Sequence, residues 1–421
     1  MRHRTCLFHY NRDIMKDKLL IIFVLGLLMS ACSEDQPGVI DENQNFNEND
    51  GANNENNGTD QRLLLNGAID LDNLLNYANQ EIPEYINKDN TGSNTISNIE
   101  ASLGRVLFYD TNLSSDNTVS CASCHQQEFA FSDPEVRSQG VNALTGRHSM
   151  RLVNARFAEE QRFFWDERAD DLEQQTTMPI RDHGEMGFSG NSGDLDFDDL
   201  IERLSGIDYY NSLFQEAFGD QIITEERIQD ALAQFIRSIQ SFDSKYDEGR
   251  TQVNSENQNF PNFTALENMG KRLFMDGPQF QGPSGIRIGG GLGCNGCHNA
   301  PEFDIDENSR NNGVIGLAGD QTGIDLDVTR SPSLRDLISP GGVVNSAFMH
   351  TGEFSSLEEV LAHYNDIDIA PNNNNLDQRL ARGGGVQLNM TQQEITAVVA
   401  FLETLTGSDV YTNEKWSNPF N

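Results

Sequence analysis

Two pentads, Cys121-Ala122-Ser123-Cys124-His125 and Cys294-Asn295-Gly296-Cys297-His298, decide how this chain folds. Each has two cysteines three positions apart, followed directly by a histidine. This spacing is typical of a c-type haem site, in which the thiols form thioethers and the histidine binds the iron. Zinc or a redox dithiol is the alternative, and the histidine in each pentad disfavours both. The sequence therefore predicts two covalently bound haems.

The N-terminal residues have the features of an export signal. Two lysines precede the apolar run Leu19–Leu28, which is short for a membrane span. The run ends in Met29-Ser30-Ala31-Cys32, which resembles a bacterial lipobox. We expect residues 1–32 to be a lipoprotein-type signal peptide, with acyl chains on Cys32 anchoring a periplasmic protein to a membrane of the bacterial envelope. Ordinary cleavage to an unanchored periplasmic protein is the alternative.

The composition after the signal is acidic and polar. Residues 33–60 are rich in asparagine and contain no lysine or arginine, so we expect a disordered tether. The net charge of the whole chain is −36, which disfavours binding to nucleic acid. Residues 61–421 are enough for two domains.

Sequence motifs recur around the two pentads. The segment Leu103–Asp110 precedes the first pentad and Met269–Asp276 precedes the second, with Gly, Leu, Phe and Asp in register. Arginine-rich segments follow both pentads, at Arg147–Leu152 and Arg330–Arg335. We therefore predict two related c-type cytochrome domains, residues 61–250 and 251–421, each around one haem.

The hydrophobic periodicity predicts a mainly α protein. Residues 226–242 carry apolar side chains at three- and four-residue spacing. Residues 356–364 and 391–404 also read as helices, the latter with a capping box formed by Thr391 and Glu394. The Gly-rich residues 282–293 read as a flexible approach to the second haem.

Two haems alone do not distinguish an electron carrier from an enzyme. A peroxidase needs one iron that is open to peroxide and a nearby group that moves protons. Glu185 is a candidate for that group, although from composition alone a solvated loop carboxylate is the simpler interpretation. For Trp165, core packing is likewise the simpler interpretation.

Several further motifs occur in a fixed order along residues 95–408. They are Leu103-Gly104-Arg105-x-Leu107-Phe108, Val119–His125, Phe164-Trp165-Asp166-x-Arg168-Ala169-x-x-Leu172-x-x-Gln175, Pro179-Ile180 with Glu185-Met186, the second pentad, and Met349-His350-x-Gly352-x-Phe354-x-x-Leu357-Glu358-Glu359-Val360. This order resembles the bacterial di-haem cytochrome c peroxidase family, which includes the methylamine utilisation protein MauG.

The resemblance implies a role for each matching residue. His125 would be the proximal ligand of the peroxide-reacting haem, and His298 that of the electron-transfer haem. Glu185 matches the acid–base glutamate of the family, and Gln175 matches a second polar residue of the same pocket. Trp165 matches a tryptophan between the haems, which would lie near the domain interface.

The sequence departs from the family pattern at both distal positions. Members whose peroxidatic iron is blocked carry a histidine in the stretch matching Ser138–Asn142, which has none here. We therefore predict that the first haem is open. For the second haem the matching distal ligand is Tyr364, as in MauG. Met349 is the alternative if a local insertion shifts the match.

The resemblance also implies one calcium ion between the haems. Its ligands would be backbone carbonyls near Asn345 and Ala347 and an asparagine that is replaced here by His148. Imidazole is a poor ligand for this hard cation, which argues against the site.

The predicted function is reduction of hydrogen peroxide to water with electrons from a small cytochrome c or a cupredoxin. One alternative is a MauG-like oxidase that acts on a protein side chain or an organic substrate. The other is an electron carrier without catalysis. The family resemblance also allows a homodimer.

Overall fold

The computed structural model describes residues 62–320 and 323–420. The predicted signal peptide, the tether and Cys32 lie outside these residues. Within the described ranges no helix has the length and apolar character needed to cross a bilayer.

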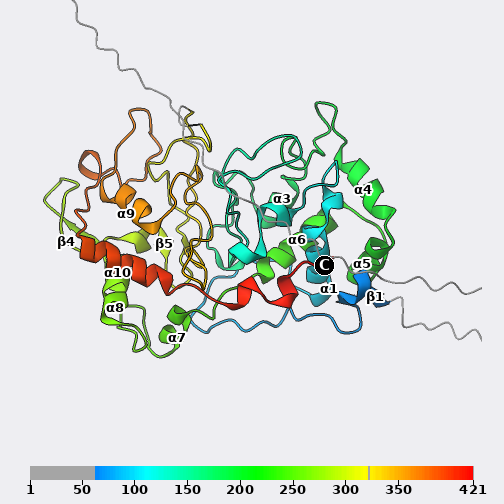
Figure 1. Ribbon diagram of the computed structural model, residues 1–421, viewed down its shortest axis with the longest axis horizontal. Coiled ribbons are helices and arrows are strands. Elements are labelled where there is room, and N and C mark those ends of the chain that lie inside the picture. Colours follow the sequence, from blue (N-terminus) through cyan, green and yellow to red (C-terminus); the bar gives the residue numbers. More distant parts are fainter. Residues whose placement is uncertain (1–61, 321–322, 421) are drawn as a thin grey trace, which may run out of the picture. The chain divides into compact units, whose positions relative to one another are not determined.

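Helices joined by long loops make up the described part of the chain, and the mainly α prediction is confirmed (Figure 1). The α-helices are α1 (Asn98–Tyr109), α2 (Cys121–Cys124), α3 (Leu172–Thr177), α4 (Phe197–Ser205), α5 (Asp208–Phe218), α6 (Glu225–Ser238), α7 (Lys245–Thr251), α8 (Ala265–Met275), α9 (Leu357–Asn365) and α10 (Gln392–Glu403). The strands form short antiparallel pairs, β1 (Leu63–Leu64) with β2 (Ile69–Asp70), β3 (Pro278–Phe280) with β4 (Arg287–Gly290), and β5 (His298–Asn299) with β6 (Asp304–Ile305).

The three helices expected from periodicity are present. Helix α6 ends at Ser238, four residues earlier than predicted, because Ile239 takes an extended conformation. Helix α9 follows its N-cap Ser356. Helix α10 has the predicted capping box, in which the side chains of Thr391 and Glu394 each accept a hydrogen bond from the other residue's backbone N–H. The Gly-rich residues 282–293 include β4, so part of that segment is a hairpin strand.

The repeated motifs before the two pentads form helices α1 and α8, and each of these helices packs against a second helix in the same way. Gly104 of α1 lies against α6, where a Cβ atom would be 1.9 Å from the carbonyl oxygen of Ala231. Gly270 of α8 lies against α10 in the same way, with a Cβ position 1.8 Å from the carbonyl oxygen of Ala397. Only glycine permits such a close approach of two helices. The glycine that recurs before each pentad is therefore a packing requirement of each helix pair.

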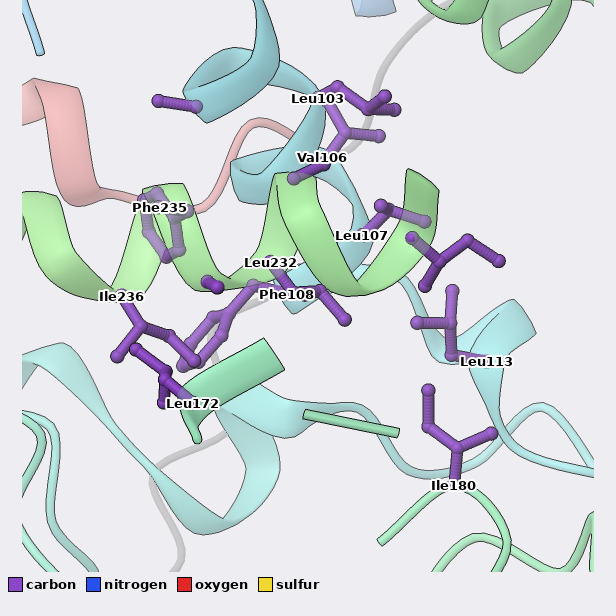
Figure 2. Packing of buried hydrophobic residues seen from close by; sticks show 14 of the residues in the cluster. Leu103, Val106, Leu107, Phe108, Leu113, Leu172, Ile180, Leu232, Phe235 and Ile236 are labelled. Carbon is purple, nitrogen blue, oxygen red and sulfur yellow. The ribbon is translucent and has the colours of Figure 1, made fainter. Parts of the chain in front are cut away.

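Two hydrophobic cores surround these helix pairs. In the first, the Phe108 ring of α1 packs 5.1 Å from the Phe235 ring of α6, with Leu232 beside them (Figure 2). Trp416, near the C-terminus, also belongs to this first core and is 1% exposed. The hydroxyl of Tyr109 donates to the Trp416 carbonyl over 2.6 Å. Trp416 thus stabilises the core formed by α1 and α6, which lie before and after the first pentad in the sequence. The domain boundary near residue 250 stays a prediction.

Candidate active site

A cavity of about 490 Å³ opens beside the first pentad. Residues predicted to act together line it, although they are far apart in the sequence: Cys121, Cys124, His125, Trp165, Gln175 and Glu185. Its size falls within the range that is common for ligand and cofactor pockets.

The first pentad forms a short helix that directs its side chains into this cavity. Ser120 begins the turn, and its backbone N–H donates to the Ser123 hydroxyl over 3.0 Å. The ring Nδ1 of His125 lies 3.3 Å from the Phe131 carbonyl oxygen. In the tautomer that donates this bond, Nε2 keeps its lone pair and can bind a metal. Burial lowers the pKa of His125, which favours the neutral imidazole that a ligand requires.

Glu185 reaches the same cavity from a loop after α3. Its backbone N–H donates to the carboxylate of Asp182 over 3.0 Å, while no hydrogen bond to its own carboxylate occurs among the described residues. Burial, together with the negative charge of Asp182, raises the pKa of Glu185 to about 7, and Arg168 opposes the shift. A carboxyl group with this pKa can both accept and return a proton near neutral pH.

The loop that lacks a histidine holds Glu185 in place. Val141 donates from its backbone N–H to the Glu185 carbonyl over 2.8 Å, and Asn142 and Ala143 donate to the Gly184 carbonyl over 3.1 Å. Gly140 makes this contact possible, since a Cβ there would be 2.7 Å from the Cα of Glu185. The missing histidine of this loop led to the prediction of an open iron. The role of the loop in positioning Glu185 was not predicted.

Substituting Gly140 with alanine is expected to displace the Glu185 loop. The added methyl group would also be 2.2 Å from the Gly184 carbonyl oxygen. Overpacking of this kind costs about 1–3 kcal/mol, so thermal unfolding should occur at a lower temperature and the rate of any reaction in this cavity that depends on Glu185 should fall. Gly277→Ala, where the methyl group meets nothing within 4 Å, is the control. Equal unfolding temperatures and rates in the two variants would refute the positioning role of Gly140.

Trp165 lies between the first cavity and a second one, and it lines both. It is 7% exposed, and its indole Nε1 donates to the His148 carbonyl over 2.7 Å. Its ring centroid is 6.1 Å from that of His350. The backbone carbonyl of Trp165 accepts a hydrogen bond from the backbone N–H of Arg330 over 3.1 Å. The indole is therefore fixed between the segments that follow the two pentads.

Two histidines near the first cavity differ in their surroundings. His183 is turned outward, with half of its side chain exposed and Nδ1 2.8 Å from the Asp194 carboxylate. His148 is 4% exposed and lines both cavities. Its Nδ1 faces the Glu135 and Val136 carbonyl oxygens at 3.0 and 3.2 Å, and its Nε2 has no hydrogen bond among the described residues.

The second cavity, of about 130 Å³, adjoins the second pentad. Cys294, His298, Met349 and Tyr364 line it. The side-chain amide of Asn312 donates to the Tyr364 hydroxyl over 3.1 Å and to the Met349 sulfur over 3.3 Å. Both candidate distal ligands therefore lie at one place, and the sequence did not predict that Asn312 brings them together.

Both candidate ligands have features typical of functional positions. Met349 has a φ of 68°, a left-handed conformation that costs energy in a residue other than glycine. Burial raises the pKa of Tyr364 well above its usual range, so its phenol stays protonated unless a metal ion binds it. The geometry brings both residues to the cavity, and the preference for Tyr364 stays a prediction.

The four pentad cysteines form no disulfide, and the pKa of their thiols bears on the redox-dithiol alternative. Burial raises the pKa of Cys121 and Cys294 to about 12, and that of Cys124 and Cys297 to about 11. A redox dithiol needs a lowered thiol pKa, which is the opposite shift. Within residues 62–320 and 323–420 no three or more His, Cys, Asp or Glu side chains are grouped as a metal-ion site. Two thiols and one imidazole beside each cavity fit a c-type haem.

The residues near the predicted calcium position fit that ion poorly. The Asn345 amide donates to the Asp336 carbonyl and to the Tyr411 hydroxyl, each over 2.8 Å. The neighbouring Ser346 hydroxyl accepts from the guanidinium of Arg151 over 3.4 Å. A positive charge next to the predicted ligands disfavours a second cation.

Comparison with known proteins identifies the family. The family model described as di-haem cytochrome c peroxidase matches residues 98–254. The methylamine utilization protein MauG of Methylorubrum extorquens is 31% identical over 326 residues, which cover 74% of this chain and 80% of that protein. The chain belongs to the di-haem cytochrome c peroxidase family. Cytochrome c551 peroxidase of Nitrosomonas europaea is 27% identical over 312 residues, 73% of this chain and 80% of that protein.

A solved structure supports the same assignment. The crystal structure of a MauG-like protein associated with microbial copper homeostasis matches with a TM-score of 0.63 and 26% identity, covering 82% of this chain and 99% of that one. As a member of the di-haem peroxidase family, the chain is an oxidoreductase of a class that uses c-type haem. Because its relatives include both MauG and cytochrome c peroxidases, family membership does not decide between these activities.

Proposed function

We propose that this protein is an exported di-haem peroxidase that reduces hydrogen peroxide to water with electrons from a small cytochrome c or a cupredoxin. One observation carries the proposal: Glu185, with a pKa raised to about 7 by burial, lines the same cavity as the first pentad. An electron carrier has no need of a proton-transferring carboxylate beside an open cavity.

In this proposal the pentads hold the two cofactors. Cys121 and Cys124 form thioethers to the first haem and His125 binds its iron, while Cys294, Cys297 and His298 do the same for the second. A haem bound at the first pentad supplies an iron that binds peroxide and accepts its oxidising equivalents. Every other step is the work of side chains around the two cavities.

Glu185 acts as base and then as acid. Its carboxylate takes the proton from the peroxide oxygen that faces the iron and returns it to the outer oxygen. The outer oxygen leaves as water when the O–O bond breaks, and two electrons from the redox partner with two protons from solvent convert the inner oxygen to a second water. Gln175, which lines the same cavity, orients the peroxide by hydrogen bonding. Trp165 then carries electrons from the second site to the first, which is supported by its position in the lining of both cavities.

A MauG-like oxidase is the second candidate function. It is favoured by Tyr364, because an anionic oxygen ligand stabilises ferric iron and would lower the potential of the second haem. Steady-state consumption of peroxide with a reduced cytochrome c tests the first proposal. Peroxide-dependent oxidation of a protein or organic substrate, without cytochrome turnover, would favour the second. Absence of both reactions would leave an electron carrier.

Substitution of the distal residues should identify the ligand of the second haem. Tyr364→Phe removes the oxygen and is expected to change the absorption spectrum of the second haem, because its iron loses a ligand. Met349→Leu is the matched variant, with similar volume and no expected spectral change. The reverse pattern would make Met349 the ligand.

The proposal includes the predicted signal peptide and lipid anchor at the N-terminus. Export follows from the signal-like residues 1–32, and anchoring from acylation of Cys32. Mass spectrometry of the mature N-terminus tests both. A diacyl or triacyl group on Cys32 is expected, and cleavage elsewhere would argue for an unanchored periplasmic protein.

A further inference from the structure

The wall between the two cavities is positively charged. The residues that line both cavities are His148, Ser149, Met150, Arg151, Trp165, Arg330, Ser331 and Pro332. Arg151 and Arg330 bring two guanidinium groups to this wall. Within the described part of the chain, no aspartate or glutamate lines both cavities.

Arg151 has no ion-pair partner among residues 62–320 and 323–420. Its guanidinium donates to the Ser333 carbonyl over 3.3 Å and to the Ser346 hydroxyl over 3.4 Å, and both distances are long for a charged donor. Its Nε is buried without a hydrogen-bond partner, and it forms no ion pair with any described carboxylate. Burial lowers the pKa of Arg151, and Asp336 opposes that shift only from a distance.

Arg330 lies in the second arginine-rich segment and has a similar environment. Its guanidinium donates to the Arg162 carbonyl and lies 4.8 Å from the centre of the Phe163 ring. It too forms no ion pair with the carboxylates that the structure describes. Burial lowers the pKa of Arg330 despite longer-range attraction from Glu160, Asp304 and Glu167.

The other arginines of the same two segments are paired. Arg147 lies 2.6 Å from the Asp166 carboxylate and 2.8 Å from that of Asp325. Arg335 lies 2.8 Å from the Asp247 carboxylate. Within these two segments, therefore, the arginines without an ion pair are the ones that line both cavities.

Both side chains are partly exposed at the cavity walls, and a guanidinium that has left bulk water without a counterion is stabilised when an anion binds it. Each haem carries two carboxylate side groups, and the arginine fork matches a carboxylate well. We propose that Arg151 and Arg330 form an anion site shared by the two cavities, which binds carboxylate groups of both haems. The inference rests on the proposed haem sites and adds an electrostatic connection between them.

This arrangement predicts a joint effect on the two reduction potentials. A positive charge in the wall between two low-dielectric cavities stabilises the reduced form of both irons. Removing Arg151 should therefore move both potentials in the same direction. A residue with a purely structural role in one domain would not do so.

Spectroelectrochemical titration of the holoprotein tests the proposal. In Arg151→Gln both haem midpoint potentials are expected to become more negative, whereas Arg151→Lys, which keeps the charge, should stay close to the wild type. Arg330→Gln should shift both potentials in the same direction as Arg151→Gln, and it serves if that variant does not fold. Arg227→Gln changes the net charge equally but lines neither cavity, so it should leave both potentials unchanged.

Three outcomes would overturn the inference. A shift of one potential alone would show that the site is not shared, and no shift beyond that of Arg227→Gln would show that no carboxylate is bound there. Wild-type potentials that depend on added inorganic phosphate would assign the site to a free anion. Haem content is measured first: fewer than two haems per chain refutes the proposed function itself, whereas two haems with unaltered potentials refute only this inference.

Discussion

Replacing Glu185 with glutamine is expected to slow the reaction with hydrogen peroxide about 10²- to 10⁴-fold, the range for loss of a general acid–base group. Glutamine keeps the size and polarity of the side chain but cannot accept the proton from peroxide. Stopped-flow mixing of the diferric protein with peroxide measures the step directly. Covalent haem content should be unchanged, since Glu185 is not part of either pentad.

The pH dependence gives a second signature of Glu185. The reaction requires the carboxylate, and the pKa of Glu185 is raised to about 7, so the rate should rise through pH 7 and level off above it. Glu185→Gln should lose this step. Glu202→Gln, an exposed glutamate of α4 that lines neither cavity, is the matched control and should keep the wild-type rate and profile. A Glu185→Gln variant with the wild-type rate would exclude the proposed proton transfer.

Replacing Trp165 with phenylalanine should separate peroxide reduction from electron supply. The first reaction with peroxide is expected to remain, while oxidation of the reduced second haem slows about tenfold or more, which corresponds to about 1.4 kcal/mol in the barrier. The variant should also lose about 1–3 kcal/mol of stability, because the His148 carbonyl loses its 2.7 Å hydrogen bond from the indole. Stopped-flow absorbance resolves the two haems.

Trp416 provides a matched control for that experiment. Its indole is also buried and donates a hydrogen bond, to the Ser238 hydroxyl over 3.3 Å, but it lines neither cavity. Trp416→Phe should lower stability and leave the oxidation rate of the second haem unchanged. If both variants slowed electron transfer equally, the effect would come from stability, and Trp165 would not be the bridge.

Local sequence patterns predicted much of the fold. The pentads, the helix periodicity of α6 and the Thr391–Glu394 capping box depend on neighbouring residues, so the chain alone reveals them. The recurring glycine before each pentad was visible as a repeat, but its cause was not. The reason is the close approach of Gly104 to α6 and of Gly270 to α10, contacts between segments more than 100 residues apart.

Long-range contacts also limited what could be predicted about the site. Spacing in the sequence gave Tyr364 and Met349 as mutually exclusive candidates for the distal ligand of the second haem. In the structure a shared hydrogen-bond donor, Asn312, brings both to the second cavity. The absence of an ion pair at Arg151 could not be predicted either, because it depends on which carboxylates fold near it. The residue types in the pentads and at Glu185 indicated haem binding and proton transfer. Contacts between distant segments decide which side chains can take part.

In the proposed function the two haem sites are unequal, one open to peroxide and one closed by a protein ligand. The most direct test is electron paramagnetic resonance of the diferric holoprotein, combined with its absorption spectrum. One high-spin ferric haem, from the open first site, is expected together with one low-spin haem. A spectrum that contains only low-spin iron would contradict it, and would point to the unpaired Nε2 of His148 as a ligand that blocks the first site.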